Sequence, residues 1–396
     1  MPRHSERNDA QRNEVEESLL SSAAPPLAPA FEKNNVAVVF AADGGYGKYL
    51  LVTLTSLAAH AAPENNYDLV ILDGGLSATS KQFISRLARE NISIRYCDIG
   101  AFMQAHAGAF PLTVSHITLA TYYRFFIPQI LPDYEKIVYL DSDLILDGDV
   151  AELFNFDLRG KMLAAVRDPY PVIFNDRVTF ADYVRDTLKL ENAEDYFNAG
   201  VLLMNVRRMV AEHFTEQCVE CATRLYKVLK FVDQCVLNAL FADNEVTPLP
   251  DKFNAMWQYI LPVHRQRIIS PEALLAYRKI YDDAPLITHY TTFRKPWNFM
   301  PSDSGNWPGT ERWWKYARLT PCYEFFLSRI IKMQAPTAVN QKIKLFGTLT
   351  VLRVKREKQK LKIYLLNFIP FISVIKTSFI KRHVALFGVP LITIKN

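Results

Sequence analysis

Apolar runs alternate with longer amphipathic segments along most of this chain, between Asn35 and His289. The apolar runs that predict strands are Val36–Ala42, Tyr67–Leu72, Ile92–Cys97, Ile137–Leu140, Met162–Val166, Ala199–Asn205 and Leu286–His289. The amphipathic segments that predict helices are Tyr49–His60, Lys81–Glu90, Ile117–Ile127, Met209–Leu229 and Val232–Phe241. Because strands and helices that alternate in this way build a mainly parallel sheet covered on both faces, we predict an α/β fold.

The two ends of the chain break this pattern. Residues 1–34 are charged and polar and then rich in alanine and proline, which predicts a disordered leader without a secretory signal. Residues 332–396 hold thirteen Lys/Arg and one acid, Glu357, a net charge of +12. Since the whole chain carries +5, residues 1–331 carry −7. We therefore expect one globular domain at 35–331, followed by a basic amphipathic C-terminal extension at 332–396.

The basic extension has its own patterns. Arg353–Leu366 places basic and apolar residues at helical spacing, which is typical of a helix on a membrane surface; a solvated basic helix and a nucleic-acid patch are the alternatives. Leu345-Phe346-Gly347 and Leu386-Phe387-Gly388 begin two copies of a short unit. The charge-free run Ile363–Ile375 is shorter than the roughly 20 residues of a transmembrane helix. We expect a cytoplasmic protein, peripheral on the inner face of the cytoplasmic membrane, whose tail binds an anionic surface and no nucleic acid.

Composition narrows the class of protein further. Hydrophobic residues make up 49% of the chain, so most of it should be globular. The five cysteines are odd in number and follow no framework spacing, which predicts free thiols in a reducing compartment. Cys218 and Cys221 form a CxxC pair inside a predicted helix, with no second pair. We interpret them as buried helical residues rather than zinc ligands.

The strongest chemical signal is Asp141-Ser142-Asp143, which ends an apolar strand at the edge where open α/β sheets bind ligands. Residues i and i+2 of an extended chain share one side, so both carboxylates can hold one divalent cation while Ser142 faces away. Aspartyl-phosphate hydrolases begin a similar motif with Asp-x-Asp, but Ile145 stands where those enzymes have Thr or Val. A turn without chemical function is the third interpretation.

Two residues far along the chain favour the metal. His289 follows the apolar run Leu286–Thr288, so it also lies at the carboxyl end of a predicted strand. Two carboxylates, one imidazole and phosphate oxygens suit Mn²⁺, with Mg²⁺ as the second choice. Lys295 lies close by in sequence, and a cation beside a metal is what a pyrophosphate leaving group requires.

Together these segments resemble family 8 of the glycosyltransferases, in particular the bacterial enzymes that add galactose or glucose to lipopolysaccharide core. The resemblance covers about Val36 to Trp297. Its ordered blocks are Phe40-Ala41-Ala42-Asp43 with Tyr46, His116-Ile117-Thr118 with Thr121-Tyr122-Tyr123-Arg124, Tyr139–Asp143, Phe197–Leu203, Asp233-Gln234 with Leu237-Asn238, and His289–Trp297. It implies a nucleotide-diphospho-sugar transferase domain of the GT-A type.

The resemblance also implies roles for individual residues. Asp43 would form a hydrogen bond to uracil, and Tyr46 would stack on the face of the uracil ring. The residues that would contact the donor nucleotide are Ala42, Asp43, Tyr46, Arg124, Asp141, Ser142, Thr292 and Lys295. The metal ligands would be Asp141, Asp143 and His289, and the catalytic residues around the donor sugar Asp168, Asn198, Asp233 and Gln234. His116 would lie towards the acceptor.

The family retains anomeric configuration, and the resemblance implies that the Gln234 amide oxygen stabilises positive charge at the anomeric carbon. We predict transfer of a hexose from UDP-glucose or UDP-galactose to lipopolysaccharide or another lipid-linked saccharide. Gly45, Cys235 and Thr292 depart from the family pattern, and these departures bear on the donor more than on the reaction. The alternatives are a UDP-hexose-dependent enzyme with a protein or soluble acceptor, a sugar-nucleotide hydrolase or phosphatase, and a non-catalytic sugar-nucleotide-binding protein.

Overall fold

The computed structural model describes residues 24–110, 112, 118–173, 178–257, 270–291, 295–300, 309–334, 338–345, 349–357, 360–366, 369–376, 381–386 and 389–395. The chain divides into two compact units, Met1–Phe326 and Leu327–Asn396. We describe each unit by itself. The predicted site residues His116 and Thr292 lie outside the described residues.

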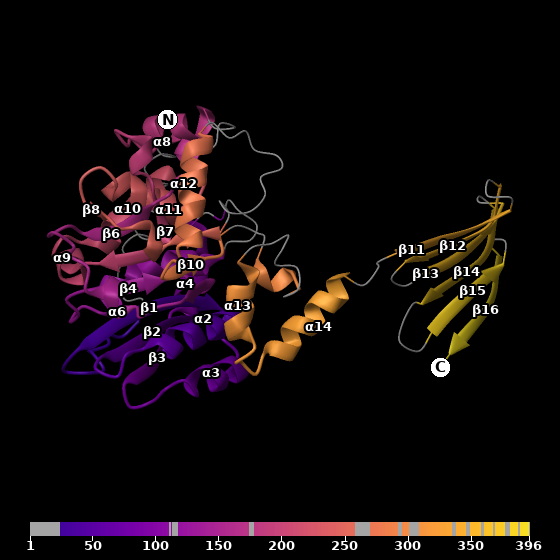
Figure 1. The fold of residues 1–396 in the computed structure, drawn as a ribbon, viewed down its shortest axis with the longest axis horizontal. Helices are drawn as coiled ribbons and strands as arrows, with labels where there is room; N and C mark the ends of the chain where they lie inside the picture. Colours follow the sequence, from indigo (N-terminus) through magenta and orange to yellow (C-terminus); the bar gives the residue numbers. More distant parts are fainter. Residues whose placement is uncertain are drawn as a thin grey trace, which may run out of the picture. The chain divides into compact units, whose positions relative to one another are not determined.

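A seven-stranded sheet forms the centre of the first unit (Figure 1). Its strands, in spatial order, are β3 (Ile92–Asp98), β2 (Asn66–Gly74), β1 (Asn35–Asp43), β4 (Ile137–Leu140), β7 (Phe197–Met204), β6 (Leu163–Arg167) and β8 (Val246–Pro248). Strands β3, β2, β1 and β4 run parallel, β7 is antiparallel to both neighbours, and β6 is parallel to β8. The prediction of a mainly parallel sheet in an α/β fold is confirmed.

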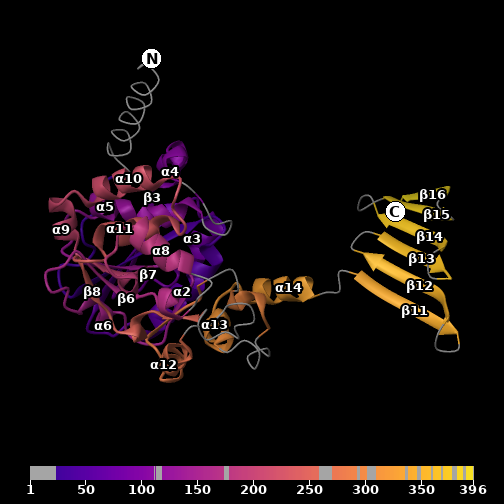
Figure 2. The same ribbon diagram turned by 90° about the horizontal axis from the view of Figure 1, so that it is seen from above.

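Helices cover both faces of this sheet. Figure 2 shows α10 and α11 on one side, and α2 and α6 on the other. The helices of this unit are α2 (Gly47–His60), α3 (Ala78–Ser85), α4 (Gly100–Ala105), α5 (Ile127–Ile130), α6 (Ala151–Phe154), α7 (Tyr170–Ile173), α8 (Val178–Asp186), α9 (Val206–Ala211), α10 (Phe214–Leu225), α11 (Val232–Phe241), α12 (Pro271–Asp282) and α13 (Thr310–Ala317). The short 3₁₀ helices are η1 (Ala107–Ala109), η2 (Leu119–Phe126), η3 (Ala193–Asp195), η4 (Asp251–Phe253) and η6 (Pro296–Asn298).

Strand β1 shows why a continuous apolar run in the sequence is typical of a central strand. Ala37, Val39 and Ala41 belong to the core that includes residues of α10 and α11. Val36 and Val38, on the opposite side of the strand, are equally buried. A strand that is covered on both faces has no polar positions to alternate with, so it appears in the sequence as an unbroken run.

A second, three-stranded sheet positions the site. Its order is β5 (Leu144–Leu146), β10 (Ile287–His289) and β9 (Ala255–Met256). Strand β10 is antiparallel to β5, with His289 opposite Leu144, and parallel to β9, with His289 opposite Met256. Because β5 begins directly after Asp143, this pairing brings His289 beside the acidic strand end.

Three predicted helices differ from the observed ones. Within the segment predicted at Ile117–Ile127, Leu119–Phe126 forms the 3₁₀ helix η2, and α5 begins at Ile127. The segment Met209–Leu229 is broken into α9 and α10 at His213, whose backbone is left-handed with φ 54°. A left-handed residue cannot continue an α-helix, so the chain turns there. The helix predicted at Lys81–Glu90 lies earlier, because Ser77 caps α3 by accepting a hydrogen bond from Ser80 N.

Part of the predicted leader is attached to the first unit. Residues 24–34 form no helix or strand, but Leu27 N donates to Ile130 O at 2.7 Å and Ala30 N donates to Asp68 Oδ2 at 3.0 Å. Arg95 Nη1 also donates to Ala28 O at 2.7 Å. This stretch of 1–34 therefore has fixed backbone partners; residues 1–23 lie outside the described part.

The second unit contains the end of α14 (Tyr323–Gln334) and a six-stranded antiparallel sheet. The strands follow one another in order: β11 (Ala338–Leu345), β12 (Leu349–Glu357), β13 (Lys360–Leu365), β14 (Ile369–Lys376), β15 (Lys381–Leu386) and β16 (Val389–Lys395). The prediction of a basic helix at Arg353–Leu366 is wrong, since this stretch forms β12 and β13. No helix among the described residues has both the length and the apolar character to cross a bilayer.

The internal repeat of the tail has three copies rather than two. The hairpins close at the pairs Leu345↔Leu349, Leu365↔Ile369 and Leu386↔Val389. Each has a register shift at the same place, between Ile343/Lys344, Ile363/Tyr364 and Val384/Ala385. The middle copy has Leu365-Leu366-Asn367 instead of Leu-Phe-Gly, so it lacks the motif that marks the other two in the sequence.

Candidate metal and donor site

The acidic pair lies where β4 ends. Asp141 N donates to Gly200 O at 2.9 Å, which continues the pairing of β4 with β7 by one residue. Ser142 lies between the two aspartates in sequence, but its Oγ donates to Ala41 O at 2.8 Å, so its side chain points towards β1. The strand end therefore separates the serine from the aspartates, as the i, i+2 spacing predicts.

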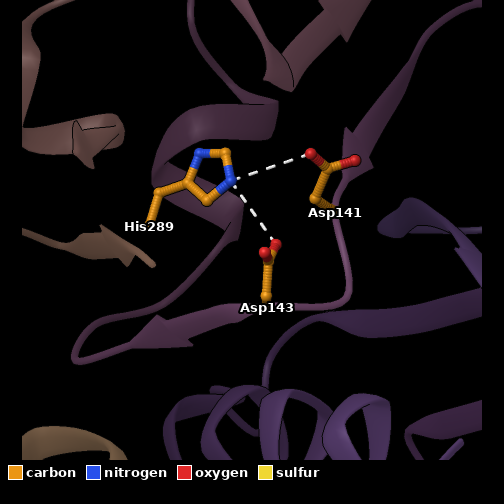
Figure 3. Close-up of side chains that lie close together, drawn as sticks. All are labelled: Asp141, Asp143 and His289. Carbon is orange, nitrogen blue, oxygen red and sulfur yellow. Dashed lines mark ion pairs between the residues drawn. The ribbon is translucent and has the colours of Figure 1, made fainter. Parts of the chain in front are cut away.

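His289 completes a group of three candidate metal ligands. Its Nε2 lies 3.4 Å from Asp143 Oδ1 and 3.7 Å from Asp141 Oδ2, and both carboxylates face the same ring nitrogen (Figure 3). One ligand atom from each residue lies within 4.8 Å of the others. Within the described part of the chain, no other His, Cys, Asp and Glu side chains form such a group. Two carboxylate oxygens and an imidazole nitrogen fit Mn²⁺ or Mg²⁺.

Each carboxylate uses its second oxygen for a buried cation. Arg124 Nη2 lies 2.9 Å from Asp141 Oδ1, and Lys295 Nζ lies 2.5 Å from Asp143 Oδ2. Arg124 also pairs with Asp233 Oδ2 at 3.0 Å, and Lys295 donates to Tyr290 O at 2.6 Å. The oxygens that face His289 are thus the ones left for an added cation.

The surroundings shift the pKa values of three groups. Burial acts to raise the pKa of Asp143, but the charge of Lys295 outweighs it and holds that pKa well below its usual range. Burial raises the pKa of Asp233 to about 6, although Arg124 opposes the shift. Burial, with the charges of Asp143 and Asp141, raises the pKa of Tyr46 far above its usual value. Asp143 therefore stays ionised at neutral pH, while Tyr46 stays a neutral phenol.

A network of amides adjoins the ligands. Gln234 Oε1 accepts from Asn198 Nδ2 and from Ala199 N, both at 3.1 Å. Asn198 Oδ1 accepts from Gly200 N at 3.0 Å and from Asn254 Nδ2 at 2.9 Å. The oxygen of Asn254 lies 3.0 Å from His289 Nδ1. Hydrogen bonds therefore connect Gln234 to a metal-ligand candidate.

One cavity of ≈ 220 Å³ contains most of the predicted residues. Those that line it are Ala42, Asp43, Tyr46, Arg124, Asp141, Ser142, Asp143, Asn198, Asp233, Gln234, His289 and Lys295. Asp43 Oδ1 accepts from Gly45 N at 2.9 Å and from Tyr46 N at 3.2 Å, which holds the first loop in a turn. Asp168 is absent from the lining; its Oδ1 accepts from Tyr170 N at 3.1 Å.

Several residues that line or adjoin the site were not predicted, and Asn254, Thr121 and Gly200 are among them. Asn254 reaches His289, Thr121 Oγ1 donates to Asp233, and Gly200 lies directly beneath the imidazole. Gly200 and Thr121 stand within blocks that resemble the family, so those blocks were the available signal. Asn254 follows a 3₁₀ turn before a two-residue strand, and no local pattern marks it.

The parallel sheet and the Asp-Ser-Asp strand end, with a polar cavity beside it, define a GT-A-like glycosyltransferase. The chain belongs to glycosyltransferase family 8, whose family model, "Glycosyl transferase family 8", matches residues 37–300.

Relatives agree with this membership. Glycosyltransferase GlyF of Streptococcus pneumoniae serotype 4 is 27% identical over 285 residues, which cover 71% of this chain and 61% of GlyF. Lipopolysaccharide 1,2-glucosyltransferase of Escherichia coli strain K12 is 26% identical over 183 residues, 45% of this chain and 49% of that protein. The matches thus span about half to three fifths of these two relatives.

A solved structure is similar over most of its length. The galactosyltransferase LgtC, crystallised with donor and acceptor sugar analogs, matches with a TM-score of 0.57 and 26% identity. The match covers 72% of this chain and 96% of LgtC. The similarity supports the GT-A-like assignment for the 72% of this chain that the match covers.

Proposed function

We propose that this chain is a retaining, metal-dependent hexosyltransferase. It transfers glucose or galactose from a UDP-sugar to a glycan acceptor, lipopolysaccharide or another lipid-linked saccharide. The observation that carries the proposal is the convergence of Asp141, Asp143 and His289 with Lys295 and Arg124 on one cavity. A lipopolysaccharide glucosyltransferase and a galactosyltransferase among the similar proteins support the substrate class.

The donor nucleotide occupies the part of the cavity beside β1 and β4. We assign the uracil to Asp43 and Tyr46, whose loop is held by the Asp43 carboxylate. The carboxyl ends of β1 and β4 are neighbours, with Phe40 opposite Leu140, so this loop adjoins the acidic strand end. Ala42, Ser142 and Thr292 complete the nucleotide contacts in this proposal.

Asp141, Asp143 and His289 hold Mn²⁺, or Mg²⁺ as second choice, in this proposal. When bound, the divalent cation neutralises the diphosphate and so stabilises UDP as a leaving group. Lys295 adds a positive charge at the same place. Its Nζ donates to Asp143 and to Tyr290 O, so, among the described contacts, a third N–H remains for a phosphate oxygen.

The sugar end of the cavity holds Asn198, Asp233 and Gln234, and we propose Asp168, which does not line the cavity, as a supporting residue. Both oxygens of Asp233 are engaged, one by Thr121 and one by Arg124. The Gln234 oxygen accepts two hydrogen bonds. Hydrogen bonds and the Arg124 charge withdraw electron density from the Asp233 oxygens, so this carboxylate is a weakened nucleophile. This supports front-face departure through an oxocarbenium-like state, in which Gln234 stabilises positive charge and forms no bond to the sugar.

Turnover tests the reaction. Purified protein with Mn²⁺ is given UDP-glucose or UDP-galactose and a whole-cell glycolipid extract as acceptor, and products are identified by mass spectrometry. We expect glycosylated lipid with retained configuration, and loss of roughly 100-fold or more in kcat for Asp143→Ala. Asp182→Ala, at an exposed ion pair, is the control and should leave kcat unchanged. Full activity of Asp143→Ala would contradict the assignment of Asp143 as a metal ligand.

The same assay separates the alternatives. Release of free hexose or phosphate without a glycosylated product would indicate a hydrolase or phosphatase. Transfer to protein or to a soluble sugar, but not to lipid, would indicate a different acceptor. Binding of the UDP-sugar without any turnover would indicate a non-catalytic binding protein. His116, proposed to lie towards the acceptor, is tested by His116→Ala, which should raise KM for the acceptor and leave donor binding unchanged.

We further propose that the tail binds an anionic membrane surface on the cytoplasmic side. The strand register supports this, because paired positions share a face of a sheet. One face collects the basic positions Lys342, Lys344, Arg353, Lys355, Lys360, Lys362, Lys381 and Lys395. The other collects mainly apolar positions, including Ile343, Leu352, Val354, Leu361, Ile363, Ile372, Val374, Val384 and Ile392.

Vesicle sedimentation tests this second proposal. Binding to phosphatidylserine vesicles should weaken with salt and disappear on truncation after Met333. The double variant Lys355→Glu/Lys362→Glu, at a cross-strand pair of the basic face, should bind at least about tenfold more weakly, since each basic residue contributes about 1 kcal/mol. The control Lys227→Glu/Lys279→Glu carries the same charge change in the first unit. Preference for DNA over vesicles in competition would contradict the proposal.

A further inference from the structure

Two backbone N–H groups of β7 set the orientation of two side-chain amides of the site. Ala199 N donates to the Gln234 side chain at 3.1 Å, and Gly200 N donates to the Asn198 side chain at 3.0 Å. A backbone N–H can only donate, so the atom that each one meets is an amide oxygen. The backbone therefore determines which end of Gln234 and of Asn198 is oxygen and which is nitrogen.

The orientation of Asn198 dictates that of Asn254. The Asn198 oxygen also contacts the Asn254 side chain at 2.9 Å, so the Asn254 atom there must be the donor, Nδ2. The other end of Asn254, its oxygen, lies 3.0 Å from His289 Nδ1. An amide oxygen can only accept, so the proton of the neutral imidazole lies on Nδ1. His289 Nε2 then presents its lone pair towards Asp141 and Asp143.

Asn254 is built into the fold so that it can act in this way. It is fully buried, with 0% exposure, between η4 and β9. Its backbone N donates to Asp251 O at 3.0 Å, and β9, which follows it, pairs with the strand that carries His289. The amide is therefore held on the same small sheet as the imidazole that it contacts.

We propose that Asn254 is a positioning residue for the metal site. It holds His289 in the tautomer whose Nε2 can bind a cation, and it links that ligand through Asn198 to Gln234. The inference rests on the metal site proposed above and assigns a role to a residue outside the ligand set. Loss of the Asn254 amide should therefore weaken metal binding first, and disturb the sugar end of the cavity through Asn198.

Metal binding by the full-length chain tests the inference. Mn²⁺ alone is titrated into protein without nucleotide, and free Mn²⁺ is measured by electron paramagnetic resonance. Asn254→Ala should weaken Mn²⁺ binding roughly 10- to 100-fold, the usual effect of removing a partner of a ligating histidine. Asn254→Asp loses the donor to Asn198 but keeps an acceptor for Nδ1–H, so its Mn²⁺ affinity should stay within a few-fold of wild type. Asn205→Ala, which removes an amide that caps α9, is the control and should leave the Mn²⁺ affinity unchanged.

Three outcomes would overturn the inference, and one of them also removes its basis. Absence of Mn²⁺ binding by the wild type would overturn the metal site itself. Equal affinity of wild type and Asn254→Ala would overturn the role of Asn254 alone. Equal loss in Asn254→Ala and Asn254→Asp would show a purely structural role. Nitrogen-15 spectra of the wild-type imidazoles give a direct check that needs no variant of Asn254. The His289 signals are assigned by their loss in His289→Gln. We expect these signals to show the proton on Nδ1.

Discussion

Gly200 lies so close to His289 that a β-carbon on it would come within 2.2 Å of the imidazole Cε1. The same atom would lie 2.6 Å from Asp141 Oδ2. Neither neighbour can move without losing the ligand geometry, so Gly200→Ala should weaken Mn²⁺ binding at least about tenfold and destabilise the fold by roughly 1–3 kcal/mol. Titration of Mn²⁺ and thermal unfolding measure the two effects. Gly108→Ala is the matched control, because a β-carbon there meets nothing within 4 Å. Unchanged Mn²⁺ affinity in Gly200→Ala would contradict the site.

Lys295 and Asp143 form a buried ion pair, with side-chain exposures of 10% and 12%. Lys295→Met leaves Asp143 without its nearest positive charge and should cost roughly 3–5 kcal/mol of stability. Added Mn²⁺ should raise Tm more in this variant than in wild type, since it restores positive charge beside Asp143. Lys315→Met is the control; Lys315 is 61% exposed, so its pair with Asp147 should contribute less than about 1 kcal/mol. Equal Mn²⁺ effects in Lys295→Met and wild type would contradict the assignment.

Asp233 should make stability fall as pH rises. Burial raises its pKa to about 6 in the folded protein, against about 3.9 in an unfolded chain. The folded state therefore binds the proton more tightly, and ionisation between about pH 4 and 6 costs up to about 3 kcal/mol. Asp233→Asn removes this cost, so its stability relative to wild type should rise across that window and level off above about pH 7. Denaturant unfolding without added metal measures it; a difference that is constant with pH would contradict the shift.

Asp68 attaches the leader to the sheet. It is fully buried and accepts hydrogen bonds from Tyr134 Oη at 2.6 Å, Arg95 Nη2 at 2.7 Å and Ala30 N at 3.0 Å. Asp68→Ala leaves Arg95 without its carboxylate partner and should cost roughly 3–5 kcal/mol. Trypsin should then cleave after Lys33 faster than in wild type. Asp182→Ala, at an exposed pair, should change neither stability nor cleavage by a measurable amount. Unaltered cleavage in Asp68→Ala would show that other contacts hold the leader.

The predictable part of the site is the part that follows strands. Asp141 and Asp143 follow β4, and His289 is the last residue of β10, so each lies at the carboxyl end of a strand that the sequence predicts. The contact between His289 and the aspartates depends on the pairing of β10 with β5, which no local pattern contains. Asn254 was missed for the same reason, because its function arises only when β9 lies beside β10.

The sequence by itself determined the class of fold, the family and most of the residues that line the cavity. A strand that is buried on both faces of a sheet appears in the sequence as an apolar run, and the blocks that resemble the family lie at the ends of those runs. Only the tertiary structure decided how the tail folds, because the basic and apolar residues of Arg353–Leu366 satisfy a helical period and a strand period alike. Pairing of Val354 with Ile363, and of β12 with β11, selects the strand. Tertiary structure likewise decided the proton position on His289, through amide contacts between segments distant in sequence.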